Sequence, residues 1–169
     1  MKRALLLALA FTVSLSAAPN PVTTVILVRH AEKVSSDDDS PLTPAGTERA
    51  NELARVFAGV KLDAIYTTQW RRVRDTAAPI AQATGLTAIV RNTGERYAAD
   101  LANEVLTQHR GQTVLVVGHS NTTVSVMKAL GATNVNAIAD SEYDNLYVLT
   151  DVDGATPKVL ALRFGNVAH

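Results

Sequence analysis

The chain has 169 residues, and 47% of them are hydrophobic, which is enough for one domain with its own core. Sixteen basic and sixteen acidic residues give a formal net charge of zero, so the chain lacks the broad positive surface typical of nucleic-acid-binding proteins. It has no cysteine, which excludes disulfides, thiolate metal ligands and a cysteine nucleophile.

The first residues are predicted to be a secretory signal peptide. A positive start at Lys2 and Arg3 is followed by a run of about ten apolar residues and then by small residues up to Ala18. The apolar run is shorter than the roughly 20 residues that a transmembrane helix needs. An uncleaved anchor is the alternative. We expect residues 1–18 to be removed on export, to the periplasm or the exterior, leaving residues 19–169 as one domain that does not bind a membrane.

The next part of the chain predicts strands and helices in alternation. In chain order we expect a strand at 23–29, a helix that begins at Thr43 and ends at Gly59, a strand at 62–67, a helix at 71–84, a strand at 86–91, a helix at 95–109, a strand at 113–117 and a helix that stops at Gly131. This alternation is typical of a largely parallel sheet flanked by helices. Residues 145–150 and 158–164 differ, because they predict an antiparallel hairpin at one edge of the sheet.

Two of the apolar strands end in a histidine. Residues 25–28 lead into Arg29 and His30, and residues 113–117 lead into Gly118 and His119. Ligands bind at the carboxyl ends of the strands in open α/β sheets. Three arginines follow the strand at 62–67: Arg71, Arg72 and Arg74. Guanidinium groups hold phosphate oxygens, and an imidazole is a nucleophile or proton shuttle, so the set predicts phosphoryl transfer.

Four segments give the chain a resemblance to a known family. Arg29-His30-Ala31 resembles the Arg-His-Gly signature of the histidine phosphatase superfamily, also called phosphoglycerate mutase-like. Three further segments resemble its other motifs, in the family's order: Leu42-Thr-Pro-Ala-Gly46, the stretch from Ile65 to Ala77, and Val116-Val-Gly-His-Ser120. The resemblance implies the three-layer α/β/α sandwich of that family, with a mostly parallel sheet and an antiparallel carboxyl-terminal edge.

The resemblance also implies roles for single residues. His30 becomes the nucleophile that is phosphorylated, and Arg29, Arg72 and His119 complete the phosphate pocket. Asn121 follows the second histidine motif, where its amide either holds a phosphate oxygen or caps the helix. The family needs no metal or cofactor for this chemistry, so none is expected. Arg71 and Arg74 fall outside the motif register and are expected to be solvated helix charges.

The general acid is not marked by any motif. Family members that cleave ordinary phosphomonoesters place a carboxyl group after the third strand to protonate the leaving oxygen. Glu95 is our choice for this role and Asp100 the alternative, although small members without an acid act on better leaving groups such as phosphohistidine. Of the remaining histidines, His109 and His169 have no partner motif and are expected to be exposed and inert.

Several residues near the predicted pocket have open roles. The acidic stretch from Ser35 to Ser40 is either a solvated connection or a flexible rim over the site, in the second case with a weak cation site. Glu32 and Lys33 are expected to be rim residues or an ion pair that orients the pocket. Ala31 replaces the family's glycine and adds a methyl group near the site.

Other enzyme classes lack their signatures here. His30-Ala-Glu32 resembles part of a zinc site, but the chain has neither the cysteines of a deaminase nor a His-Glu-x-x-His helix. Residues 118–122 lack the Gly-x-Ser-x-Gly of a nucleophile elbow, and no glycine-rich dinucleotide turn is present. We therefore expect an exported, metal-independent phosphatase acting on a small phosphorylated substrate, a phosphomonoester or a phosphoramidate. The alternative is an exported module that binds phosphorylated ligands without catalysis. The oligomeric state is left open.

Overall fold

The computed structural model describes residues 21–154 and 156–166. The predicted signal peptide and His169 lie outside these residues. The strands are β1 (Thr24–Arg29), β2 (Ala64–Thr67), β3 (Ile89–Val90), β4 (Thr113–Gly118), β5 (Asn145–Thr150) and β6 (Lys158–Arg163), and the helices are α1 (Pro44–Val56), α2 (Arg71–Thr84), α3 (Tyr97–Gln108) and α4 (Ser120–Ala129). Within the described part of the chain, none of these helices has the length and apolar character to cross a membrane.

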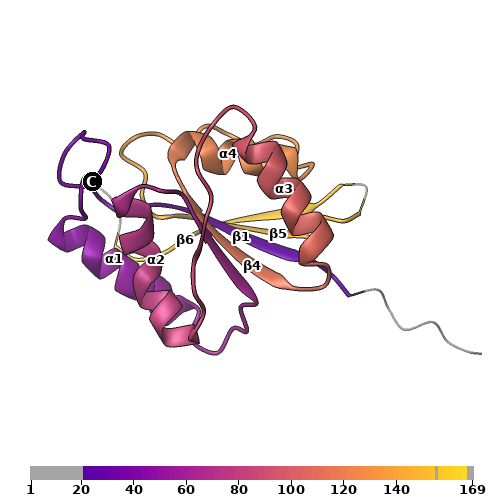
Figure 1. The fold of residues 1–169 in the computed structure, drawn as a ribbon, viewed down its shortest axis with the longest axis horizontal. Helices are drawn as coiled ribbons and strands as arrows, with labels where there is room; N and C mark the ends of the chain where they lie inside the picture. Colours follow the sequence, from indigo (N-terminus) through magenta and orange to yellow (C-terminus); the bar gives the residue numbers. More distant parts are fainter. Residues whose placement is uncertain (1–20, 155, 167–169) are drawn as a thin grey trace, which may run out of the picture.

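The strands form one sheet in the order β3-β2-β4-β1-β5-β6. The pairs β2–β3, β2–β4 and β1–β4 are parallel, whereas β5 pairs antiparallel with both β1 and β6. Figure 1 shows the sheet between two layers of helices, with α1 and α2 on one face and α3 and α4 on the other. The predicted α/β/α sandwich with an antiparallel carboxyl-terminal edge is therefore confirmed.

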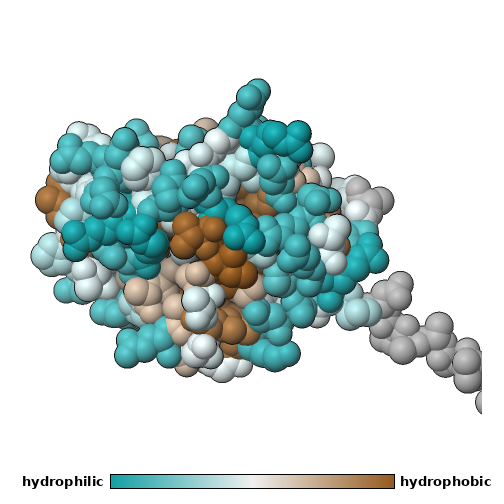
Figure 2. All heavy atoms as spheres, in the orientation of Figure 1, coloured by the Kyte–Doolittle hydropathy of each residue, from teal (hydrophilic) through white to brown (hydrophobic). Residues whose placement is uncertain are grey.

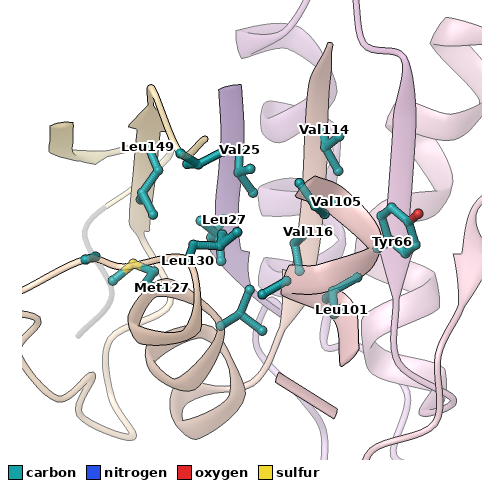
Figure 3. Close-up of a cluster of buried hydrophobic side chains, with 14 of the residues drawn as sticks. Val25, Leu27, Tyr66, Leu101, Val105, Val114, Val116, Met127, Leu130 and Leu149 are labelled. Atoms are coloured by element: carbon teal, nitrogen blue, oxygen red, sulfur yellow. The ribbon is translucent and has the colours of Figure 1, made fainter. Parts of the chain in front are cut away.

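The central strands are apolar on both faces because both faces are covered. Val25 and Leu27 of β1 point toward α3 and α4, where they pack with Leu101, Val105 and Met127 (Figure 3). The alternate residues of the same strand, Ile26 and Val28, pack on the opposite face against α1 and α2. This burial on both sides explains why β1 and β4 are continuous apolar runs in the sequence. The face of the molecule shown in Figure 2 is correspondingly hydrophilic over most of its area.

The ends of two helices follow local chemistry. Thr43 is the N-cap of α1, and its side chain accepts a hydrogen bond of 3.0 Å from the backbone N–H of Gly46. Gly85 ends α2 in the left-handed conformation with φ of 71°, which glycine adopts without strain. Both boundaries agree with the sequence prediction.

The third strand is shorter than predicted. We expected residues 86–91, but β3 is only Ile89–Val90, at the edge of the sheet, where it pairs with the end of β2. Ile89 is half-buried and Val90 is exposed, so this segment contributes little apolar burial to hold a longer strand. The β-branched residues of this segment favour a strand, but they do not show that the strand lies at the edge of the sheet.

Candidate active site

The pairing of β1 with β4 brings the two histidines together. Arg29 is the register partner of Gly118, and the backbone N–H of His30 donates to the Gly118 carbonyl at 2.8 Å. His30 and His119 therefore leave neighbouring parallel strands at the same level. Their ring centroids are 5.3 Å apart, and the rings meet edge to face. The predicted juxtaposition at the carboxyl ends of the strands is confirmed.

Helix α2 supplies the third group of the site. Arg72 and Thr76 lie one turn apart on its buried side. The Thr76 hydroxyl accepts a hydrogen bond from the Ala31 backbone N–H at 2.9 Å and donates to the Arg72 carbonyl at 2.7 Å. This link fixes the first turn of α2 to the chain just after His30. The link also explains the spacing between the Arg72 and Thr76 positions in the family motif.

The other two arginines of the cluster point away from the site. Arg71 is exposed and pairs with Asp75 on the next turn of α2. Arg74 is also exposed, and its guanidinium donates to the Gln69 carbonyl. Neither lines the pocket that contains Arg72. The choice of Arg72 from the sequence register is therefore supported by the geometry.

The histidines and arginines line one pocket of about 610 Å³. Arg29, His30, Arg72 and His119 are each no more than 9% exposed, so they form its inner part. The other lining residues are Lys33, Trp70, Thr93, Ser120, Asn121, Thr122, Asp140 and Tyr143. Helix α4 begins at this pocket, and the N-terminus of a helix favours anions through its free N–H groups and dipole.

The environment of His30 favours its neutral form. Its Nδ1 lies 2.8 Å from the Ala31 carbonyl, which accepts hydrogen bonds only, so we assign the proton to Nδ1 and the lone pair to Nε2. The pKa of His30 is lowered to about 3, mainly by burial and also by the charges of His119, Arg29 and Arg72, against the opposing effect of the Ala31 carbonyl. Burial is thus a larger cause than the neighbouring cations.

His119 is held by a hydrogen bond at each ring nitrogen. Arg72 Nη2 lies 3.3 Å from its Nδ1, and Thr68 Oγ1 lies 3.0 Å from its Nε2. Because a guanidinium only donates, Nδ1 is the acceptor and the proton is on Nε2, which donates to Thr68. Burial, followed by the charges of Arg72 and Arg29, lowers the pKa of His119 to about 4.

The loop after α4 holds the other arginine. Arg29 Nη1 donates to the carbonyls of Ala139 and Glu142 at 2.8 and 3.2 Å. The Tyr143 ring lies under the guanidinium, with 4.2 Å from the Arg29 Cζ to the ring centroid. The Nε atoms of Arg29 and Arg72 are buried and have no hydrogen-bond partner among the described residues. Unsatisfied buried donors are costly and are a feature of sites that hold a ligand.

The acidic loop from Ser35 to Ser40 lies beside the site. Lys33 forms an isolated bridge with Leu42 at its base, and the Asp39 carboxylate accepts from the Arg71 backbone N–H at 2.9 Å. The Asp38 carbonyl accepts from the Arg72 guanidinium. The loop is thus attached to the start of α2 beside the site, and residues 36–39 are at the same time exposed to solvent, as both the rim and the solvated connection predict. In the described residues, no cluster of three or more histidine and carboxylate side chains is arranged to hold a metal ion.

Three sequence-predicted groups lie elsewhere than the pocket. Glu95 is exposed, Asp100 is exposed and paired with Arg96, and neither lines the pocket. The structure therefore does not bring the predicted general acid to His30. Asn121 does line the pocket, and although the N-cap residue of α4 is His119, the Asn121 side-chain oxygen accepts a hydrogen bond of 2.8 Å from the Thr122 backbone N–H in the first turn of α4.

Glu32 has a different partner from the one expected. Its carboxylate accepts hydrogen bonds of 3.1 and 2.7 Å from Arg49 of α1 rather than pairing with Lys33. Arg49 also donates to the Phe164 carbonyl, so the pair ties α1 to the chain after β1 and to the end of β6. Burial acts to raise the pKa of Glu32, but the hydrogen bonds from Arg49 and from the Glu32 backbone N–H, together with the charges of Arg49 and Arg29, outweigh it and the pKa is lowered. Because Arg49 occupies the Glu32 carboxylate, the pairing argues against Glu32 as a zinc ligand together with His30.

The prediction for His109 is wrong. It is half-buried, its Nε2 lies 2.8 Å from the Tyr66 hydroxyl, and its Nδ1 lies 2.6 Å from Gln112 Oε1. Tyr66 also donates to Glu104 at 2.9 Å. The sequence carries no local signal for this cluster, because Tyr66 and His109 come from β2 and the end of α3.

Sequence reasoning also missed three pocket residues. Trp70, Tyr143 and Asp140 come from loops, and their side chains reach the site only through tertiary structure. The signal that was available is weak. Trp70 directly precedes the Arg71–Arg74 segment, and Tyr143 precedes β5 within a stretch that resembles small members of the family.

The fold and the pocket together define a class of protein, an α/β/α sandwich with histidines and arginines at the carboxyl edge of its parallel strands. A family model described as histidine phosphatase superfamily (branch 1) matches residues 25–94. This match and the shared fold confirm the predicted resemblance to the histidine phosphatase superfamily. No curated protein matches the chain.

Several solved structures share the fold. Mycobacterial glucosyl-3-phosphoglycerate phosphatase is 14% identical, with a TM-score of 0.69 over 85% of this chain and 100% of its own. A Nakamurella multipartitia protein with the provisional name phosphohistidine phosphatase SixA is 25% identical, with a TM-score of 0.61 over 90% and 100%. The protein histidine phosphatase SixA complexed with tungstate is 15% identical, with a TM-score of 0.65 over 83% and 96%. The neighbours thus include phosphatases.

Proposed function

We propose that the protein is a metal-independent phosphatase that hydrolyses a phosphomonoester or a phosphoramidate through a phosphohistidine intermediate on His30. The observation that supports this most is the state of His30. Its Nδ1–H donates to the Ala31 carbonyl, which leaves the lone pair of the neutral ring on Nε2, in a pocket with two arginines. A nucleophile and fixed cations around one pocket are what phosphoryl transfer requires.

The roles of the other groups follow from their positions. Arg29 and Arg72 hold the equatorial oxygens of the transferring phosphoryl group, where negative charge is spread in the transition state. His119 lies against His30, and its Nε2–H, which donates to Thr68 in this structure, turns to the same oxygens when a phosphoryl group is bound. Asn121, at the start of α4, is placed to add a neutral donor.

The test is turnover of p-nitrophenyl phosphate by residues 19–169, with and without EDTA, together with acid-quenched labelling of the protein. We expect EDTA to have no effect. His30→Ala should lower kcat by at least about three orders of magnitude, because the nucleophile is removed, and should abolish the label. Arg72→Ala should lower kcat/KM by about 10²-fold, the size expected for one lost transition-state donor, whereas Arg74→Ala should leave it near wild type.

The competing function is a module that binds phosphorylated ligands without catalysis. It uses the same four residues, so binding of inorganic phosphate does not distinguish the two. Phosphate binding with neither turnover nor a label on His30 would contradict the enzyme and favour the module.

We further propose that the protein acts outside the cytoplasm, on small phosphorylated molecules. The argument for export is the amino-terminal sequence pattern, and the argument for small substrates is the size of the pocket. Expression of the full chain in a bacterium, followed by fractionation and amino-terminal sequencing, tests export. A mature start between residues 17 and 19 in the periplasm or medium is expected, and an intact Met1 in the cytoplasm would contradict it.

A further inference from the structure

The chemistry proposed for His30 leaves proton transfer unassigned. Attack by His30 and departure of the leaving group occur in line, on opposite sides of phosphorus. Because His30 is 3% exposed at the inner part of the pocket, the leaving oxygen and the later attacking water lie on the side that faces solvent. The group that transfers their proton must therefore line the outer part of the same pocket.

Asp140 is the one carboxylate among the residues that line this pocket in the described part of the chain. Its side chain is 97% exposed, and its Oδ1 lies 3.5 Å from Arg29 Nη2. The carboxylate thus stands at the mouth of the pocket, next to a guanidinium that the proposed function places on the phosphoryl oxygens. Glu95 and Asp100, the sequence-based choices, do not line the pocket.

The turn that carries Asp140 is fixed in place. The backbone N–H of Glu142 donates to the Ala139 carbonyl at 3.0 Å, and the Glu142 carboxylate accepts from the Ala139 N–H at 2.8 Å. Arg163 of β6 holds the Glu142 carboxylate at 3.0 Å, and Arg29 donates to the carbonyls at both ends of the turn. A side chain on a turn held from three directions is preorganised, unlike one on a free loop.

Five other polar residues of the pocket are unsuited to this task. Both ring nitrogens of His119 are engaged, by Arg72 and by Thr68. The Lys33 ammonium has no lone pair with which to accept a proton from water. Asn121, Ser120 and Thr93 are neutral and do not exchange protons readily near neutral pH. A carboxylate, in contrast, is a common general acid and base.

We propose that Asp140 is the proton-transfer residue of this pocket, an inference that rests on the proposed phosphohistidine mechanism. In the first step the His30 Nε2 lone pair forms the bond to phosphorus. The bond from phosphorus to the leaving oxygen breaks, and that oxygen takes the electron pair and a proton from the Asp140 carboxyl group. In the second step a water oxygen bonds to phosphorus, its proton passes to the Asp140 carboxylate, and the electron pair of the broken P–N bond returns to Nε2.

The test is rapid-quench kinetics with p-nitrophenyl phosphate on wild type and Asp140→Asn. Because p-nitrophenolate leaves without an acid, the variant should still form the phosphoenzyme but hydrolyse it slowly. We expect kcat to fall by about 10²-fold, a typical loss for a general base, with a burst of p-nitrophenol equal to the enzyme concentration and accumulation of label on His30. With phenyl phosphate, a poor leaving group, the burst should disappear because the first step slows as well.

Two controls accompany this variant. Asp153→Asn makes the same chemical change at an exposed position in the turn between β5 and β6, and it should behave as wild type. Glu95→Gln tests the sequence-based choice directly. The accumulation of phosphoenzyme in Glu95→Gln instead of Asp140→Asn would overturn the proposal.

The remaining outcomes also decide the matter. Wild-type kinetics in Asp140→Asn would overturn the role of Asp140 while leaving His30 chemistry intact. A lower kcat/KM with weaker inhibition by phosphate and no accumulated label would also overturn it, because Asp140 would then act only by aligning Arg29. Failure of the proposed function is distinct, since wild type itself would then show no label on His30.

Discussion

Two adjacent threonines at the end of β2 have opposite hydrogen-bonding states. Thr67 and Thr68 are both fully buried. The Thr68 hydroxyl lies 3.0 Å from His119 Nε2, whereas the Thr67 hydroxyl has no partner among the described residues. A buried donor that loses its acceptor costs about 1–3 kcal/mol, so the two hydroxyls are not equivalent. The difference makes Thr67 a matched control for Thr68.

We expect Thr68→Val to lower kcat/KM by about tenfold, equivalent to about 1.4 kcal/mol, because the His119 ring loses the acceptor that fixes its orientation. Thr68→Ser keeps the hydroxyl and should restore most of the activity. Thr67→Val removes only an unpaired hydroxyl, so activity and Tm should be equal to or above wild type. Steady-state kinetics and thermal unfolding of the three variants check this. Equal losses in Thr67→Val and Thr68→Val would show that β2 responds to any change of shape at its end.

At the scale of elements, α1 is placed by a close approach of its first turn to the chain after β1. A Cβ atom added to Gly46 would lie 2.3 Å from the Glu32 carbonyl oxygen, a backbone atom that cannot rotate away. The Glu32 side chain meanwhile binds Arg49 one turn later in α1. The glycine of the Leu42–Gly46 motif is therefore required by packing, since only glycine permits this contact.

Gly46→Ala should lower the free energy of unfolding by about 3 kcal/mol, the upper part of the range for overpacked sites. Gly94→Ala is the matched control, because a Cβ atom there has no neighbour within 4 Å. It should change stability by less than about 1 kcal/mol, and in the stabilising direction. Urea denaturation of both variants measures the difference. A Gly46→Ala variant as stable as Gly94→Ala would mean that α1 moves away from β1 at little cost.

The elements that the sequence predicted well are those whose signals are local. The apolar run of β1, the Thr43 cap of α1 and Gly85 at the end of α2 each depend on neighbouring residues and on burial. β3 was overextended because its position at the sheet edge depends on the order of strands, which no local pattern states. The same limit applies to His109, which reaches Tyr66 across 43 positions of sequence.

At the scale of the whole molecule, the inner and outer parts of the pocket differ in how far the sequence predicts them. Arg29, His30 and His119 come directly from the ends of paired strands, so the parallel sheet alone places them together. Tyr143 and Asp140 come from the loop before β5, which is held by Arg29 and Arg163, both distant in sequence, as well as by its own Glu142. The inner residues of the pocket were therefore predictable from the sequence, whereas Tyr143 and Asp140 in its outer part were not.

The two buried histidines should make the stability of the fold depend on pH. The pKa of His30 is lowered to about 3 and that of His119 to about 4, chiefly by burial, from an ordinary value of 6.5. Between these values and 6.5 the unfolded chain binds protons that the folded protein does not, so stability rises with pH in this window. The contribution of the two neutral histidines to the free energy of unfolding is complete above about pH 6.5. It is lost as the pH falls toward the pKa values of the folded protein.

We expect wild type to lose about 2 kcal/mol of unfolding free energy per histidine between pH 6.5 and pH 5, since each pH unit in the window corresponds to about 1.4 kcal/mol. His30→Asn should lose about 2 kcal/mol less than wild type over the same interval, while Thr67→Val should follow the wild-type curve. Urea denaturation in phosphate-free buffers measures both, because a bound anion would stabilise the folded state by itself. Parallel curves for wild type and His30→Asn would mean that the imidazole accepts a proton inside the fold. In that case His30 would be cationic in mild acid, and activity rather than stability would fall between pH 6.5 and pH 5.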